Sequence, residues 1–128
     1  MPHSILSCSG LALALLPAAF GTAALLYPDA ALSAVFSFPA PKDATAQELT
    51  SSIMRVYGLR NIAVSYLLAL IWSTGNDKLK GRGLLVGLLL CVGDGMISHH
   101  LIGEGQWNHW AYVPVIGGVC AGLLGWFD

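Results

Sequence analysis

The sequence predicts an all-α protein, an integral membrane four-helix bundle, from its composition, the length of its apolar runs and the placement of its charges. Hydrophobic residues make up 55% of the 128 residues and charged residues only 10%, which is fewer charges than a soluble domain carries. Backbone polar groups in lipid are satisfied only within helices or closed barrels, and a helix of about 20 apolar residues crosses the hydrocarbon core. We therefore expect one domain over residues 1–128, with helices at about 4–26, 47–73, 83–102 and 110–127.

The first apolar run, 4–26, is long enough to cross a membrane, and Pro17 near its middle predicts a kink because proline removes a backbone hydrogen bond. A cleaved signal peptide is the alternative, since the small residues Gly21, Thr22 and Ala23 resemble a cleavage site. No Lys or Arg precedes the run, whereas signal peptides begin with positive charge. We therefore interpret this run as a retained helix.

The connector that follows, 27–46, contains three prolines and an apolar middle, 30–38, that is too short to span a membrane. We expect this middle part to lie at the membrane interface or to dip back into the mouth of the bundle. The polar residues Asp43 and Thr45 come just before the next helical pattern. Either side chain is of the kind that caps the first turn of a helix.

Two ionisable residues lie deep inside apolar runs, Arg60 in the second predicted helix and Asp94 in the third. At 1.5 Å per residue both fall near the middle of the membrane. An arginine at that depth costs about 2.5–3.5 kcal/mol on insertion scales, so it is rarely there without a partner. The sequence therefore predicts an Arg60–Asp94 ion pair. The pair is either the centre of a functional site or a purely structural contact that fixes helix register.

The hydrophilic turn at 74–82 holds the densest positive charge in the chain, with Lys78, Lys80 and Arg82. Positive charge in short loops marks the cytosolic side of a membrane protein. The turn and both termini are therefore expected in the cytosol, and residues 103–109 on the opposite side. We expect a multi-pass protein of the endoplasmic reticulum or another endomembrane.

Glycine repeats at a spacing of four residues occur in the last two predicted helices, as Gly83 with Gly87 and Gly118 with Gly122. Small residues at this spacing let membrane helices pack closely. In a chain with 15 glycines the same spacing also arises by chance. Both interpretations are compatible with the sequence.

Polar side chains gather on one side of the predicted membrane midplane. These are Tyr57, Arg60, Asp94, Ser98, His99 and His109. The cytosolic half consists almost entirely of Leu, Val, Gly and Ala, which predicts a pocket that is closed toward the cytosol and open toward the other side. A lipophilic molecule could enter such a pocket from the bilayer.

Signatures of metal and cofactor binding are missing from the sequence. His99 and His100 are adjacent, so their side chains point about 100° apart on a helix, and there is no histidine pair at the spacing of a zinc helix. There is also no phosphate loop, dinucleotide fingerprint, Gly-x-Ser-x-Gly or Cys-x-x-Cys. We expect no metal and no cofactor. A net charge near zero argues against nucleic acid, and leaves membrane lipid, a lipophilic small molecule and a second copy of the chain as partners.

The segment Tyr57-Gly58-Leu59-Arg60-Asn61, the basic turn, Asp94 and then His109 follow one another in a distinctive order. From residue 27 to the C-terminus the chain resembles a family of small four-helix membrane proteins of unknown function. That family has Gly-x-Arg-Asp, then an Asp in the third helix and a His before the fourth. Asn61 stands where the family usually has Asp, which weakens any role that needs a second carboxylate there.

The size and layout are also similar to those of fungal epoxide hydrolases in polyene α-pyrone pathways of the aurovertin and citreoviridin kind. This resemblance implies a hydrolase or cyclase that opens a lipophilic polyene epoxide in secondary metabolism. Asp94, kept ionised by Arg60, would act as base or nucleophile, and Tyr57 or His109 would protonate the alkoxide. Asn61, Ser98 and His99 are then candidate substrate contacts. Because no strong catalytic motif is present, a non-enzymatic membrane carrier or accessory subunit is the alternative.

Overall fold

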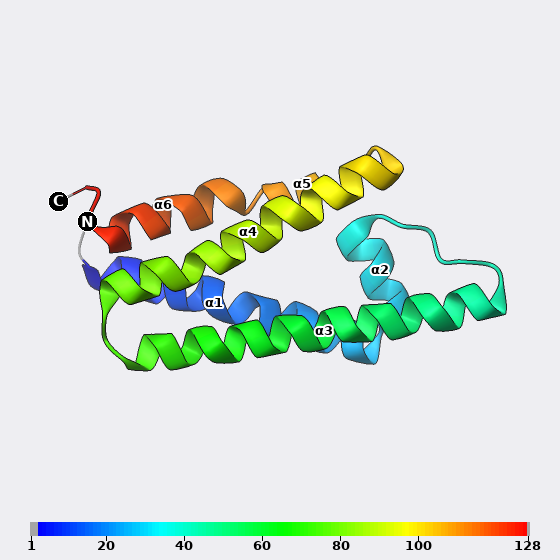
Figure 1. Ribbon diagram of the computed structural model, residues 1–128, viewed down its shortest axis with the longest axis horizontal. Coiled ribbons are helices and arrows are strands. Elements are labelled where there is room, and N and C mark those ends of the chain that lie inside the picture. Colours follow the sequence, from blue (N-terminus) through cyan, green and yellow to red (C-terminus); the bar gives the residue numbers. More distant parts are fainter. Residues whose placement is uncertain (1–2, 128) are drawn as a thin grey trace.

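The computed structural model describes residues 3–127 and is helical throughout, with no strand in that range (Figure 1). The helices are α1 (His3–Leu26), α2 (Pro28–Phe36), α3 (Ala44–Ser73), α4 (Asp77–Ile102), α5 (Trp107–Trp110) and α6 (Val113–Leu124). The all-α prediction is therefore confirmed. The outermost residues of the predicted domain, 1–2 and 128, lie outside the described residues.

Three of these helices, α1, α3 and α4, are long and apolar enough to cross a membrane. Their outward faces carry large apolar side chains that no other part of the described chain covers. Examples are Ile53, Val56, Leu59, Leu67, Leu70, Leu85, Leu89, Ile97 and Leu101. A continuous apolar surface of this kind is rare on a soluble monomer.

The fourth predicted helix is shorter than expected. α6 has 12 residues, Val113–Leu124, and so is only about 18 Å long, whereas the sequence predicted a helix at 110–127. Pro114 in the first turn of α6 has no backbone N–H, which prevents a continuous helix from Trp110 onward. Gly125, with φ of 82°, ends α6 in a left-handed conformation. A fourth helix of full spanning length is not present in the described chain.

The helices α3 and α4 both begin earlier than predicted because a polar side chain caps each one. Asp43 accepts a hydrogen bond from the backbone N–H of Ala46 at 2.9 Å, which confirms the expected cap of α3. The Asn76 side chain accepts one from Leu79 at 3.0 Å. α4 therefore starts at Asp77 and not near residue 83, and the basic residues lie in its first turns.

One of those basic residues is buried. The Lys80 ammonium donates to Asp77 Oδ1 at 2.8 Å and to Ser7 Oγ at 3.1 Å. It thereby connects the start of α4 to the start of α1. Of the three basic residues near this turn, Lys78 and Arg82 remain exposed.

The helices associate as two close pairs, α1 with α3 and α4 with the shorter α6 (Figure 1). The α3–α4 turn, the start of α1 and the end of α6 lie at one end of the molecule, and α2 and α5 lie toward the other. The first pair packs tightly at Gly21 and Gly58, where a Cβ atom added to either would come within 2.5 Å of the other's carbonyl oxygen. Glycine is therefore required at this crossing.

The main core fills the bundle at the end where α1 begins. It contains Leu6, Ala14, Leu68, Leu84, Ile116, Val119, Cys120 and Leu123. The two glycine repeats each contribute one tight contact, because Gly83 packs on Leu68 and Gly122 packs on Leu6. The repeat partners Gly87 and Gly118 face open space.

Candidate functional site

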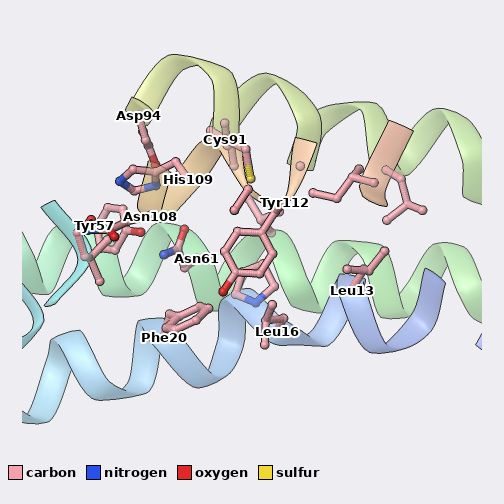
Figure 2. Close-up of a pocket in the computed structure, with 18 of the residues that line it drawn as sticks. Leu13, Leu16, Phe20, Tyr57, Asn61, Cys91, Asp94, Asn108, His109 and Tyr112 are labelled. Atoms are coloured by element: carbon pink, nitrogen blue, oxygen red, sulfur yellow. Dashed lines mark hydrogen bonds between the residues drawn. The ribbon is translucent and has the colours of Figure 1, made fainter. Parts of the chain in front are cut away.

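A cavity of about 320 Å³ lies between the two helix pairs (Figure 2). Residues spaced three or four apart line it from each long helix, which places them on one face of that helix. They are Leu13, Leu16, Pro17 and Phe20 of α1, Tyr57, Asn61, Val64 and Leu68 of α3, and Leu84, Gly87, Cys91 and Asp94 of α4. The wall is completed by Leu90 of α4, by Ala34 and Val35 of α2, and by residues 107–109, 111, 112 and 116 from α5, α6 and the link between them.

Most of the polar groups of this cavity converge at one end. Tyr57, Asn61, Asp94 and His109, four residues predicted from the sequence, all line it there, and Asn108 joins them (Figure 2). The opposite end rests on apolar residues of the main core. This arrangement suits a mostly apolar molecule that carries one reactive or polar group.

Arg60 and Asp94 form the predicted ion pair. Arg60 Nη2 lies 2.8 Å from Asp94 Oδ2 and Nη1 lies 3.5 Å from Oδ1. Only 13% of the Asp94 side chain is exposed, against 38% for Arg60. The guanidinium also lies over the Tyr57 ring, 4.7 Å from its centroid. Because Arg60 does not line the cavity, it holds the carboxylate from behind and leaves the other face of Asp94 toward the cavity.

His109 is buried at the same end, with 6% of its surface exposed. Its ring hydrogen-bonds the backbone of Val35, and since Nε2 has no partner the bond uses Nδ1. Burial lowers the pKa of His109 below 6.5, and Arg60 adds to this, while Asp94 and the bond to Val35 oppose it. The imidazole is therefore neutral at pH 7, with an Nε2 lone pair available to accept a proton.

The short helix α2 closes the polar end of the bundle. Its residue Phe36 packs against the rings of Tyr57 and His109, with centroid distances of 5.2 and 5.1 Å. The Asn108 side-chain amide donates to the carbonyl oxygens of Ala34 and Val35 at 3.3 and 3.2 Å. The sequence is compatible with two positions for residues 30–38, the membrane interface or the mouth of the bundle. In the structure this segment lies in the mouth of the bundle.

Two predicted substrate contacts, Ser98 and His99, do not line the cavity. Ser98 is fully buried and its hydroxyl has no hydrogen-bond partner. His99 is exposed, with its ring 6.3 Å from that of Trp110. The cavity ends at Asp94 because the Trp110 indole packs directly onto Gly95, the next residue of α4. The geometry thus gives no support to a binding role for either residue.

Cys91, Asn108 and Tyr112 are among the lining residues that were not identified from the sequence as part of the site. Helical spacing offered a signal for two of them. Cys91 precedes Asp94 by three residues, and Tyr112 follows His109 by three, so each shares a face with a predicted residue. Within residues 3–127, no three His, Cys, Asp or Glu side chains are placed to hold a metal ion.

Comparison with known proteins identifies a family for this chain but no activity or substrate. No curated protein and no solved structure matches the chain. The model of the family described as "Domain of unknown function (DUF4267)" matches residues 14–124, which extends the resemblance into the second half of α1, and the chain belongs to that family.

Proposed function

We propose that this protein is a membrane-embedded, cofactor-independent epoxide hydrolase or cyclase that acts on a lipophilic substrate. The observation that carries the proposal is the cavity, whose largely apolar wall ends in the Arg60-bound carboxylate of Asp94, the neutral imidazole of His109 and the phenol of Tyr57. Opening an epoxide requires a base for the attacking oxygen and an acid for the departing one. Both kinds of group are present at the same end of one cavity.

The membrane setting is part of the same proposal. The apolar outer faces of α1, α3 and α4 would contact lipid, and α6 would complete a four-helix bundle. Lys78 and Arg82 lie at the end where α1 begins and α6 ends, so both termini would be cytosolic by the positive-inside rule. An endomembrane such as the endoplasmic reticulum is the proposed location.

His109 is the better candidate for the base. Its Nε2 has no partner, whereas both oxygens of Asp94 already accept hydrogen bonds from Arg60. In the proposed reaction Nε2 takes a proton from water, and the water oxygen attacks one epoxide carbon. The carbon–oxygen bond then breaks, and the alkoxide takes a proton from the Tyr57 hydroxyl. The imidazolium returns its proton to the phenolate, and the product is a diol.

Asp94 and Asn61 have supporting roles in this scheme. The negative charge of Asp94 favours the proton on His109, and so stabilises the imidazolium as it forms. Asn61 is buried beside Tyr57 and lines the cavity, where its amide can orient water or substrate. If a hydroxyl of the substrate replaces water as the nucleophile, the same steps yield a cyclic ether.

The resemblance to the fungal epoxide hydrolases of polyene α-pyrone pathways suggests the substrate class, a lipophilic polyene epoxide of secondary metabolism.

A non-enzymatic carrier or accessory subunit is the second candidate. The observation that favours it is the lining itself, which apart from its polar end is aliphatic and aromatic and suits passive binding. Turnover separates the two, because a carrier binds its ligand unchanged.

The test uses purified protein in lipid nanodiscs with several lipophilic epoxides in ¹⁸O-labelled water. The proposal predicts multiple turnovers to a diol with one ¹⁸O atom, or to a cyclic ether without label. Asp94→Asn and His109→Asn proteins that remain folded are the matched controls and should form little product. Binding without product, across all the epoxides, would favour the carrier.

A further inference from the structure

The cavity is a slot that runs along the helix axes. Its α4 wall extends from Leu84 to Asp94, ten residues and so about 15 Å. Its α3 wall extends from Tyr57 to Leu68, about 16 Å by the same rise. The helices α3 and α4 run in opposite directions (Figure 1). The Tyr57 end of α3 therefore meets the Asp94 end of α4, where Arg60 pairs with Asp94, and Leu68 and Leu84 share the main core at the other end. Most polar groups of the slot therefore lie at one end, and the Tyr112 hydroxyl and the Cys91 thiol lie along its length.

Gly87 keeps this slot open on its apolar side. It lines the cavity about a third of the way from the apolar floor at Leu84 to Asp94 at the polar end. A Cβ atom added to Gly87 would meet nothing within 4 Å, so the space beside it belongs to the cavity. A larger side chain at this position would have room for its Cβ and would extend into the slot.

The volume of the cavity limits what the slot can hold. A cavity of about 150 Å³ is known to hold one benzene ring, and this one has about 320 Å³. It therefore has room for about a dozen carbon atoms. Spread over about 15 Å of helix axis, that number of atoms matches one extended chain, whereas a compact ring system of the same size would be shorter and broader.

We propose that the slot binds a single unbranched hydrocarbon chain of about a dozen carbons, and that Gly87 sets how far the chain reaches. The tail would lie against Leu68, Leu84 and Ile116 of the main core. The reactive group would lie between Asp94 and His109. That last placement rests on the proposed function, but the binding of the chain does not.

Cys91 provides a measurement of binding that needs no turnover. It lines the slot between Gly87 and Asp94, so a molecule in the slot shields its thiol. Alkylation of Cys91 by N-ethylmaleimide is followed by mass spectrometry on wild-type protein in nanodiscs, with alcohols compared at equal mole fraction in the bilayer. We expect 1-dodecanol to slow alkylation at least tenfold, and cyclododecanol, with the same number of carbons, to have little effect. Equal protection by the linear and the cyclic alcohol would overturn the inference.

Gly87→Leu tests the role of the glycine, with Gly118→Leu as its control. Gly118 is also a helical glycine with nothing within 4 Å of an added Cβ, but it is exposed on α6 and does not line the cavity. Relative to each protein's own rate without alcohol, Gly87→Leu should lose the protection by 1-dodecanol and keep that by 1-hexanol. Gly118→Leu should behave as wild type. Unchanged dodecanol protection in Gly87→Leu would contradict the inference.

The outcomes also separate this inference from the proposed function. If Gly87→Leu does not fold, the comparison of linear and cyclic alcohols on wild-type protein still decides. Protection by linear alcohols in a protein that opens no epoxide would support the chain-binding slot and contradict the proposed enzymatic activity. Equal turnover of linear and macrocyclic epoxides would support the enzyme and refute the slot.

Discussion

Gly21 of α1 and Gly58 of α3 face each other so closely that a side chain on either would strike the other's backbone carbonyl. This contact lies directly beside Tyr57 and one turn before Asn61, the α3 residues of the polar end. The crossing therefore fixes the spacing between two walls of the cavity. It also explains why Gly58, within the segment that resembles the family pattern, is a glycine.

Gly58→Ala should destabilise the protein, because an added methyl group forces α1 and α3 apart. Overpacking of this kind costs about 1–3 kcal/mol. Gly118→Ala is the matched control, since its added methyl meets open space and alanine favours the helix. Thermal unfolding in nanodiscs should show a lower midpoint for Gly58→Ala only. Equal midpoints for the two variants would show that the crossing tolerates a side chain.

Asn108→Asp should loosen α2 while leaving the shape of the side chain unchanged. The aspartate cannot donate to the carbonyl oxygens of Ala34 and Val35, and its charge faces them directly. Hydrogen exchange at residues 30–36 should become faster, with exchange in the core of α3 unaffected. If exchange in α2 does not change, the contact with Asn108 does not hold this helix in place.

His109 should make stability depend on pH. Because burial lowers its pKa in the folded state, the unfolded chain binds a proton first as pH falls through 6.5. The contribution of the neutral ring to the free energy of unfolding is therefore fully present above pH 6.5 and is lost progressively as the pH falls below that value. His109→Asn removes the titrating ring and can keep a donor to Val35. Below pH 6.5 the unfolding midpoint of wild type should therefore fall relative to that of the variant. A constant difference between pH 5 and 8 would contradict the assigned burial of a neutral ring.

The orientation in the membrane can be tested with inserted glycosylation acceptors. Lys80 is buried against Asp77, so the positive charge that sets orientation comes from Lys78 and Arg82. An acceptor loop inserted within 103–108 should be glycosylated in microsomes, and the same loop within 74–78 should not. The reverse result would place the polar end of the cavity toward the cytosol.

Elements that depend on local sequence were predictable here. The long helices follow from apolar length, and the pairing of Arg60 with Asp94 follows from the cost of a lone charge in lipid. The cap of α3 follows from Asp43. The length of α6 was not predicted, because the run at 110–127 is apolar throughout and its length favours a single helix, although Pro114 marks the start of a shorter one at Val113.

Contacts between distant segments account for the rest. The orientation of His109 depends on Val35, which reaches it only because α2 folds back into the bundle. Ser98 shares a helix face with Asp94, but the Trp110 side chain on Gly95 ends the cavity before that residue. Neither contact is encoded in a pattern of spacing along one helix.

The Arg60–Asp94 pair gives the sharpest test of the proposed site. Asp94→Asn leaves Arg60 without a counter-ion, and breaking a buried pair costs about 3–5 kcal/mol. The cost here should be smaller because Arg60 is partly exposed. Loss of activity in this variant alone would therefore not separate catalysis from folding. The double substitution Arg60→Met with Asp94→Leu removes both charges together, and such replacements are often neutral or stabilising.

The decisive measurement is epoxide turnover by this double variant, in preparations whose thermal unfolding midpoint is at or above that of wild type. The account predicts a folded protein that still protects Cys91 when a linear alcohol is bound and forms little diol or cyclic ether. A folded double variant that turns over epoxide at the wild-type rate would contradict the claim that Arg60 and Asp94 form part of a reactive site.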